Sequence, residues 1–318
     1  MLCCNDLHVS FTIHKKPVHV VRGVSFNLPE KKTLGIVGES GCGKSISALS
    51  IMRLVPSPPG KIDSGSILFK GKDLVKCSEK EMRKIRGQSI SMIFQDPMTS
   101  LNPVFSCGDQ IKEVLQLHRS MDPLKAFFAT KKILGEVGIN DPIRVIKSYP
   151  HQLSGGMRQR VMIAMALACS PRILIADEPT TALDVTVQAK LLELLKSLQD
   201  TRDMSMILIT HNMGIVADLA HEVIVMYAGE VLEQAQTDEL FDSPMHPYTR
   251  CLLETIPTIH KKKDRLRVIP GEVPAPQDIP DGCPFHPRCP QSMEKCTIQH
   301  PEMVLLNEQH KVRCHLYE

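Results

Sequence analysis

The stretch Gly38-Glu39-Ser40-Gly41-Cys42-Gly43-Lys44-Ser45 decides the fold. It follows a short apolar run, Thr33 to Val37, and leads into residues of helical composition, Lys44 to Leu54. Glycines at these positions let backbone N–H groups point into one concavity and approach phosphate oxygens closely. The helix adds its positive dipole end; Lys44 is placed to reach the β- and γ-phosphates, and Ser45 to ligate Mg²⁺. The segment by itself therefore predicts a phosphate-binding loop with a Mg²⁺ ligand, a glycine-rich turn that binds nothing being the alternative.

Two carboxylates end another apolar run. Asp177 and Glu178 follow Ile173 to Ala176, which is typical of a buried strand. Proteins built from strands and helices bind their ligands at the carboxyl ends of the strands. We therefore predict that Asp177 holds Mg²⁺, directly or through water, and that Glu178 polarises the water that attacks the γ-phosphate. A strand end with solvated acids is the alternative reading.

Gln95 and His211 also stand at strand ends, after Ile90 to Phe94 and Met206 to Thr210 respectively. A neutral amide such as that of Gln95 can bind Mg²⁺ or the attacking water without adding charge. His211 is placed for a contact with the γ-phosphate. Either residue in isolation would be read as an ordinary surface or core residue, and the phosphate loop favours a function for both.

A second anion site is predicted at Leu153-Ser154-Gly155-Gly156, which directly precedes the helical stretch Met157 to Cys169. Ser154 is a good N-cap, and the two glycines bare the backbone at a positive helix end. One nucleotide cannot easily use this site and the phosphate loop within one monomer. We therefore expect it to serve the nucleotide of a neighbouring subunit, a merely capped helix being the alternative.

Strands and helices alternate along the chain, which argues for a mostly parallel sheet covered by helices. An all-helical insertion, Asp109 to Tyr149, separates the first strands from the later ones, and Val185 to Gln199 is a further helix. The other expected strands are Val18 to Leu28, Gly65 to Phe69, Arg172 to Asp177, Met206 to Thr210 and Glu222 to Tyr227.

Composition narrows the class of protein. A chain of 318 residues allows one large domain with an appendage, or two modest domains. Its net charge of +3 gives no support for nucleic-acid binding, which needs a clustered basic face. No stretch reaches the roughly 18 apolar residues that cross a bilayer, and the N-terminus lacks a secretory signal. We expect a cytosolic chain that reaches a membrane only through another subunit.

The character of the sequence changes after about Leu253. Seven prolines lie between residues 270 and 290, which excludes regular helix and central strand there. We therefore predict a domain boundary near residue 255. The basic run His260 to Arg267 is interpreted as a solvated linker, with contact to anionic lipid heads as the minor alternative.

The cysteines of this last segment form a group. The chain has 11 cysteines, and in a reducing cytosol a cluster of them suggests a metal or reactive thiols. Four thiolates in a proline-rich segment with little core suggest a metal staple. Their intervals of five, six and 17 residues match neither paired Cys-x-x-Cys zinc modules nor bacterial ferredoxins, so spacing leaves the metal open. The four are Cys283, Cys289, Cys296 and Cys314.

Taken together, these segments resemble the ATPase subunit of an ABC transporter over about residues 1 to 250. The resemblance implies an α/β, P-loop NTPase fold with a RecA-like, mostly parallel sheet. It adds an antiparallel β subdomain, a helical subdomain inserted at about 97–165 and a small irregular Cys-containing C-terminal extension. The ATPase domain would be 1–255 and the extension 256–318.

The resemblance also implies roles for the residues of the site. In the family two such domains pair head to tail, so that Ser154, Gly155 and Gly156 of one close over ATP on the other. Asp184, in the loop Ala182-Leu183-Asp184, would join them. Phe11 resembles the aromatic residue that stacks on adenine, although family members more often have Tyr. The implied catalytic residues are Glu178, His211 and Gln95, and the implied Mg²⁺ ligands are Ser45, Gln95 and Asp177.

Five longer stretches of the sequence resemble the dipeptide/oligopeptide import branch of the ABC transporters. Within that branch they are most similar to the first of its two ATPase subunits. The resemblance implies a second ATPase subunit, two permeases, a solute-binding protein and a peripheral place on the cytoplasmic face of the inner membrane. It also implies a [4Fe–4S] cluster on the four cysteines, with Zn²⁺ or no metal as alternatives. The matching stretches are Gln95 to Pro103, Gly155 to Arg160, Asp177 to Gln188, His246 to Thr249 and Gly271 to Pro274.

Several functions remain open from sequence. The cargo could be dipeptides, longer peptides, nickel chelates or cationic peptides, since such subunits do not touch it. A non-transport ABC ATPase of translation or DNA maintenance is one rival, but those usually carry two ATPase domains or a long coiled-coil insertion. A metal- or redox-sensing protein regulated by the ATPase is the other.

Overall fold

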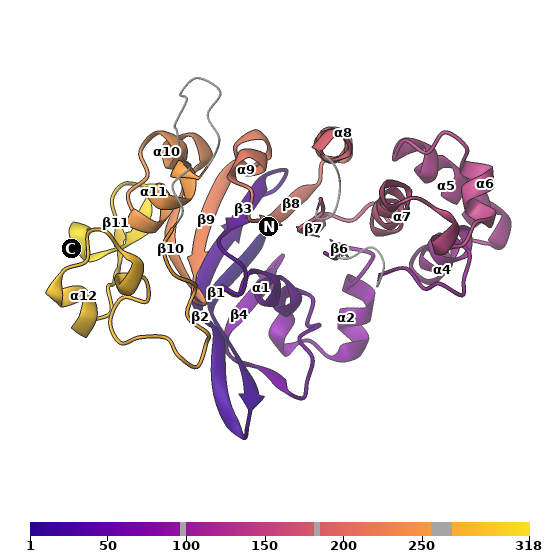
Figure 1. Ribbon diagram of the computed structural model, residues 1–318. Coiled ribbons are helices and arrows are strands. Elements are labelled where there is room, and N and C mark those ends of the chain that lie inside the picture. Colours follow the sequence, from indigo (N-terminus) through magenta and orange to yellow (C-terminus); the bar gives the residue numbers. More distant parts are fainter. Residues whose placement is uncertain (96–99, 181–184, 256–268) are drawn as a thin grey trace. The chain divides into compact units, whose positions relative to one another are not determined.

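Figure 1 shows the computed structural model, which describes residues 1–95, 100–180, 185–255 and 269–318. The chain forms two compact units, 1–76 with 208–318, and 77–207. Asp184 and the basic run His260 to Arg267 lie outside the described residues. Within the described ranges, no helix has both the length and the apolar character needed to cross a membrane.

The first unit contains a four-stranded antiparallel sheet in the order β2-β1-β4-β5. The strands predicted at Val18 to Leu28 and Gly65 to Phe69 are confirmed as parts of β2 and β4. The strand β1 was missed, because polar Asn5 and Asp6 break its alternation where the pairing shifts register. The bounds are β1 (Leu2–Ile13), β2 (Lys16–Leu28), β4 (Gly60–Phe69) and β5 (Lys72–Asp73).

A second sheet of this unit holds the strand that leads into the phosphate loop. β3 (Thr33–Val37) is buried throughout and pairs in parallel with β9 (Glu222–Tyr227). β9 turns back into β10 (Glu230–Gln236) through Ala228 and Gly229, both at positive φ as a tight hairpin requires. β12 (Lys311–Arg313) then pairs antiparallel with β10, and β11 (Met303–Leu305) pairs antiparallel with β12. The last segment of the chain thus joins the sheet of the phosphate loop, which the sequence did not predict.

Short helices complete the first unit. The side chains of Tyr227, Tyr248 and Phe285 form one buried cluster with the strand residue Val37 and with Leu240, so that the sheet and the last segment share a core. The helices are α1 (Lys44–Ile51), α9 (Met213–Leu219), α10 (Thr237–Asp242), α11 (Pro247–Glu254) and α12 (Glu294–Ile298), with single 3₁₀ turns at Leu74–Lys76, His286–Arg288 and His315–Tyr317.

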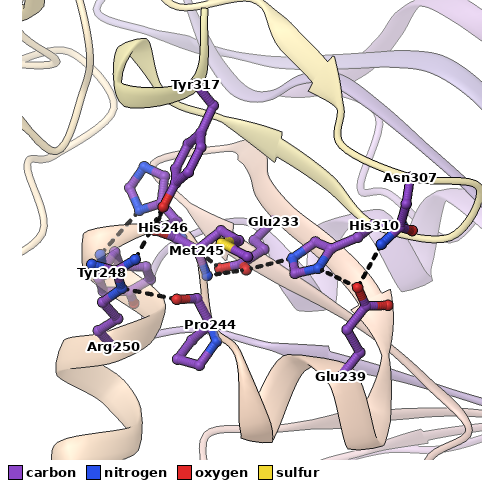
Figure 2. A network of polar contacts seen from close by, with 10 residues as sticks. All are labelled: Glu233, Glu239, Pro244, Met245, His246, Tyr248, Arg250, Asn307, His310 and Tyr317. Atoms are coloured by element: carbon purple, nitrogen blue, oxygen red, sulfur yellow. Dashed lines mark hydrogen bonds and ion pairs between the residues drawn. The ribbon is translucent and has the colours of Figure 1, made fainter.

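A polar network ties the last strands to β10 (Figure 2). Glu233 of β10 is fully buried and accepts hydrogen bonds from the backbone N–H groups of Met245 and His246, at 2.7 and 2.9 Å. The ring of His310 lies between Glu233 and Glu239, at 2.8 and 3.0 Å from their oxygens. Both carboxylates hold the pKa of His310 above its ordinary value, although burial opposes them. The buried charge of Glu233 is therefore paired and hydrogen-bonded.

The second unit is mainly helical around a pair of parallel strands, β6 (Ile90–Ile93) and β7 (Ile173–Asp177). The helical character predicted for Asp109 to Tyr149 is confirmed, but this stretch is divided into three helices. The divisions fall at Ser120, which has positive φ, and at Pro123 and Pro142, each at a helix start behind an aspartate cap. The helices are α2 (Glu79–Ile85), α4 (Cys107–Arg119), α5 (Pro123–Glu136), α6 (Pro142–Lys147), α7 (Gly155–Leu167) and α8 (Val185–Arg202).

The strand β8 (Ser205–Thr210) belongs to both units, since the division lies at Leu208. All of its residues are buried, as its apolar run predicts. The parallel pairings of β3 with β9 and of β6 with β7 agree with the parallel arrangement that strand–helix alternation predicts.

Candidate functional site

The loop between β3 and α1 has the backbone of a phosphate-binding loop. Gly38, Gly41 and Gly43 all have positive φ, at 152°, 81° and 98°. A Cβ at Gly38 would lie 2.2 Å from the carbonyl oxygen of Met226, and one at Gly43 would lie 2.8 Å from that of Val20. The loop therefore needs glycine at these two positions both for its dihedral angles and for its close contact with neighbouring backbone.

Lys44 lies at the start of α1, and its side chain is only 5% exposed. Its ammonium donates hydrogen bonds to the carbonyl oxygens of Gly38 and Glu39, at 2.8 and 2.9 Å. Cys42 is buried beside it, and burial raises the pKa of the thiol although Lys44 lowers it. The lysine charge is thus held at the loop itself, where a phosphate oxygen would bind.

The remaining loop residues differ in exposure. Ser40 is exposed, whereas Ser45 is half-buried in the first turn of α1. Glu39 is also half-buried, and it contacts two residues from the C-terminal part of the chain. Its backbone N–H donates to the hydroxyl of Tyr248 at 3.0 Å, and its carboxylate pairs with Arg288.

Gln95 and Glu178 meet at the carboxyl ends of β6 and β7. Ile93 pairs with Ala176 in the parallel register, and the chain continues from each to the two polar residues. The Gln95 amide nitrogen donates to Glu178 Oε2 at 3.0 Å. Asp177 is 5% exposed, and Glu178 has a φ of 45°, a left-handed conformation that is rare for glutamate. Such strain is characteristic of residues held for a function.

The predicted cap of α7 is confirmed. The Ser154 hydroxyl accepts a hydrogen bond from the N–H of Met157 at 3.4 Å. Ser154 and Gly155 are exposed, and a Cβ at Gly155 would have open space around it, whereas one at Gly156 would lie 3.3 Å from Val187. Exposed backbone at a positive helix end is what an anion from another molecule requires.

The other predicted residues of the nucleotide site lie as follows. His211 is exposed directly after β8. Phe11 is half-buried in β1 opposite Val18 and Gly60, and a Cβ at Gly60 would lie 2.9 Å from its ring. The contacts of these residues with a nucleotide, and the role of Asp184, stay predictions.

The four cysteines of the last segment are buried or half-buried. Burial, the largest cause, and the charges that Cys296, Cys314 and Cys289 would carry together raise the pKa of Cys283 to about 12. The backbone N–H of Cys283 donates to the carbonyl of Cys296 at 2.8 Å. All four are unbridged. Across the described ranges, no three or more histidine, cysteine or acidic side chains are arranged to hold a single metal ion.

These thiols fit a metal group chemically. Four thiolates at one place repel one another, and a bound cation removes that repulsion because it binds the deprotonated form. Cys283, Cys296 and Cys314 are buried and Cys289 is half-buried, so the place is shielded from water. The residue types suit a thiolate-bound metal or cluster, but the described side chains are not arranged around one, so the [4Fe–4S] cluster and its Zn²⁺ alternative stay predictions.

Two residues that contact the phosphate loop were missed from sequence. Arg288 pairs with Glu39 across 249 positions of the chain, and Tyr248 binds the same residue across 209. Tyr248 lies in the stretch His246 to Thr249, which resembles the dipeptide/oligopeptide import branch but to which the sequence assigned no role. Arg288 lies between Cys283 and Cys289. A charged residue that lies between cysteines of a buried segment needs a partner of opposite charge. The position of Arg288 in the sequence was therefore the signal that could have indicated such a partner.

Comparison with known proteins places these features in a family. Residues 21–181 match the family described as ABC transporter, and residues 232–296 match the oligopeptide/dipeptide transporter C-terminal region. The chain is 51% identical over 318 residues to the oligopeptide transport ATP-binding protein AppD of Bacillus subtilis, covering 100% of this chain and 97% of that one. It is 45% identical over 315 residues to the dipeptide transport ATP-binding protein DppD of Escherichia coli, covering 99% and 96%.

Solved structures agree on the fold. The ATP-binding cassette MJ0796, solved as a dimer in a post-hydrolysis state bound to ADP and Pi, matches with a TM-score of 0.67 and 26% identity. The match covers 74% of this chain and 99% of that one. The mixed α/β architecture is thus that of a P-loop NTPase, as the motifs predict. The chain belongs to the ABC transporter ATPase family, with the C-terminal region of its oligopeptide/dipeptide transporters.

Proposed function

We propose that the chain is the ATP-hydrolysing subunit of an importer of dipeptides or oligopeptides. The observation that carries this proposal is the phosphate loop, with glycine enforced at Gly38 and Gly43 and the Lys44 ammonium held at the loop. The chain is similar in sequence, over nearly its full length, to proteins named for oligopeptide and dipeptide transport, and this similarity supports the class of cargo.

In the proposed reaction, Gly38 to Ser45 bind the triphosphate and Phe11 stacks on adenine. Glu178 accepts the proton of the attacking water, and the Gln95 amide orients that carboxylate through the hydrogen bond described above. His211 contacts the γ-phosphate. Ser45, Asp177 and Gln95 offer the oxygen atoms that Mg²⁺ prefers, and the ion would neutralise phosphate charge.

The capped end of α7 is proposed to act on the nucleotide of a second ATPase subunit. Ser154, Gly155 and Gly156, with Asp184, would close over ATP held by the partner's loop, and hydrolysis would open the pair again. Two permeases and a solute-binding protein would complete the transporter. The chain would then lie on the cytoplasmic face of the inner membrane through its permeases.

The four cysteines are proposed to hold a [4Fe–4S] cluster, with Zn²⁺ as the alternative. The cation would supply a structural clamp for a segment that has little core of its own. Anaerobically purified protein is expected to contain iron and labile sulfide and to absorb visible light. The Cys296→Ser variant is expected to lose the iron, the sulfide and the absorbance. Zinc without colour would favour the alternative, since Zn²⁺ has a filled d shell.

Transport in cells tests the function. A strain that lacks this gene should fail to take up a labelled dipeptide or oligopeptide, and the wild-type gene should restore uptake. Lys44→Ala should not restore it, while Lys80→Ala, an exposed lysine of α2, is the matched control. Restored uptake of nickel chelates or cationic peptides instead would reassign the cargo. Restoration by Lys44→Ala would contradict the proposal.

A further inference from the structure

The side chain of Arg288 is 6% exposed and reaches from the cysteine segment to the phosphate loop. Its Nη1 and Nη2 atoms donate to Glu39 Oε2 and Oε1 at 2.6 and 3.0 Å. This is the two-point geometry in which guanidinium and carboxylate bind most strongly. An ion pair with one nearly buried member is costly to build unless every donor finds an acceptor.

The remaining donors of Arg288 are satisfied by its own surroundings. Nε donates to the carbonyl of Pro270 at 2.8 Å, and Nη2 donates to that of Gly271 at 3.2 Å. Nη1 also donates to the hydroxyl of Tyr227 at 3.3 Å, and the guanidinium carbon lies 5.8 Å from the centre of that ring. All five N–H groups of the guanidinium therefore have acceptors. Lysine could not reproduce this arrangement.

Glu39 is fixed at its backbone as well as its side chain. Its N–H donates to the hydroxyl of Tyr248 at 3.0 Å, and its carbonyl oxygen accepts from the Lys44 ammonium at 2.9 Å. Tyr248 is fully buried and packs edge-on against Tyr227, with ring centres 4.8 Å apart, and against Phe285 at 5.1 Å. A continuous set of contacts thus joins the cysteine segment, Glu39 and the lysine that would meet the phosphates.

The position of the pair decides its interpretation. If the cysteine segment only needed to be anchored to the rest of the first unit, apolar packing would suffice, because it often stabilises a fold as well as a buried ion pair does. Here the carboxylate belongs to the second residue of the phosphate loop, next to Gly38, whose backbone is pressed against Met226. Movement of Glu39 is therefore transmitted to the loop.

We propose that Arg288 is a positioning residue of the ATP site: it holds Glu39 and so keeps the phosphate loop in its binding shape only while the cysteine segment is folded. This inference rests on the proposed ATPase function. Coupling of two sites is reciprocal, so bound ATP must in turn stabilise the cysteine segment. Loss of the fold around Cys283 and Cys289 would weaken ATP binding at a site whose own residues are unchanged.

Nucleotide affinity tests the first half. Binding of a fluorescent ATP analogue is measured in the Glu178→Gln background, together with KM and kcat in the parent protein. Arg288→Gln should raise the dissociation constant and KM about tenfold, within the range of coupling energies of contacting residues, with kcat changed much less. The dissociation constant and KM of Arg288→Lys should lie between those of the wild type and those of Arg288→Gln. Arg313→Gln, which loses donors to the carbonyls of Val231 and Pro301, is the matched control and should bind ATP as the wild type does.

Hydrogen exchange of the intact protein tests the second half. Mg-ATP should slow amide exchange in residues 283–296 of the wild type and of Arg313→Gln, but not of Arg288→Gln. Glu39→Gln keeps the shape of the side chain and removes only its charge, so it keeps the test usable if Arg288→Gln does not fold. The double variant should bind ATP no more weakly than the weaker single variant, because both lose the same contact.

Two results would overturn the inference. Wild-type affinity for ATP in Arg288→Gln and Glu39→Gln, alongside faster exchange in residues 283–296, would make Arg288 an anchor of the segment alone, with the ATPase proposal intact. If neither the wild type nor Arg313→Gln bound ATP, the proposed function and this inference would fail together.

Discussion

The amide of Gln95 donates to the carboxylate of Glu178 at 3.0 Å, across 83 positions of the chain. The two side chains come from β6 and β7, whose parallel register brings Ile93 opposite Ala176. The hydrogen bond fixes the orientation of the Glu178 carboxylate. The pair therefore offers an oriented base at the carboxyl edge of the strands.

Glu178→Gln removes the base and keeps the shape of the side chain. We expect ATP hydrolysis to fall by about 10²-fold or more while ATP still binds, because general-base catalysis supplies that factor. The variant should remain paired in Mg-ATP with the proposed second ATPase subunit, measured by size-exclusion chromatography with light scattering. Glu193→Gln, an exposed glutamate of α8, is the control. Unchanged hydrolysis in Glu178→Gln would remove the residue from its proposed role.

Gln95→Glu places a second carboxylate beside Glu178. Like charges at this separation raise the pKa of one of the two groups, so the base should be protonated at higher pH. We expect the acid limb of the kcat–pH profile to move to higher pH by about one unit, and Gln95→Ala to lower kcat without moving the limb. Steady-state rates from pH 5.5 to 9 measure this. Identical profiles for both variants would argue against contact between the two side chains.

Gly38→Ala and Gly41→Ala separate steric from dihedral demands of the loop. Both glycines have positive φ, but a Cβ at Gly38 meets backbone at 2.2 Å, whereas one at Gly41 meets nothing within 4 Å. We expect Gly38→Ala to lower the free energy of unfolding by about 3 kcal/mol or more, and Gly41→Ala by about 1–2 kcal/mol. Chemical denaturation measures both values, and equal losses would contradict the described loop.

His310→Gln tests the network of Figure 2 by its pH dependence. Because Glu233 and Glu239 raise the pKa of His310, its charge stabilises the fold fully below the ordinary value of about 6.5, and this contribution is lost as pH rises through the raised pKa. The stability advantage of the wild type over His310→Gln should therefore shrink above pH 6.5, by up to about 1.4 kcal/mol per pH unit.

Thermal and denaturant unfolding of both proteins between pH 6 and 9 measure that difference. The neighbouring His246 does not confuse the result, since burial lowers its pKa to about 4 and it stays neutral in this range. A constant gap for His310→Gln would mean that the buried ring carries no charge.

Local patterns predicted the parts of the site that follow apolar strands. The loop after Val37, the acids after Ala176 and the cap at Ser154 each leave a short, contiguous signal, because strand end and polar residue are neighbours in sequence. The same reasoning predicted β2, β7, β8 and β9. It missed β1, whose alternation is interrupted by a change of register at Asn5 and Asp6.

Contacts between distant segments could not be read in this way. β11 and β12 have three residues each, too few for a period of two to appear. Arg288 and Tyr248 reach Glu39 only because residues 208–318 fold into one unit with residues 1–76. A single arginine among prolines and cysteines carries no periodic signal, so its partner emerges only from the tertiary structure.

The pairing of β12 with β10 has a consequence for synthesis of the protein. Residues 1–37 and 303–313 belong to one unit, so its sheet cannot be completed until the ribosome has released the chain as far as Arg313. A polypeptide chain that ended before Met303 would lack β12 and would leave β10 as an open edge of the sheet, which favours aggregation.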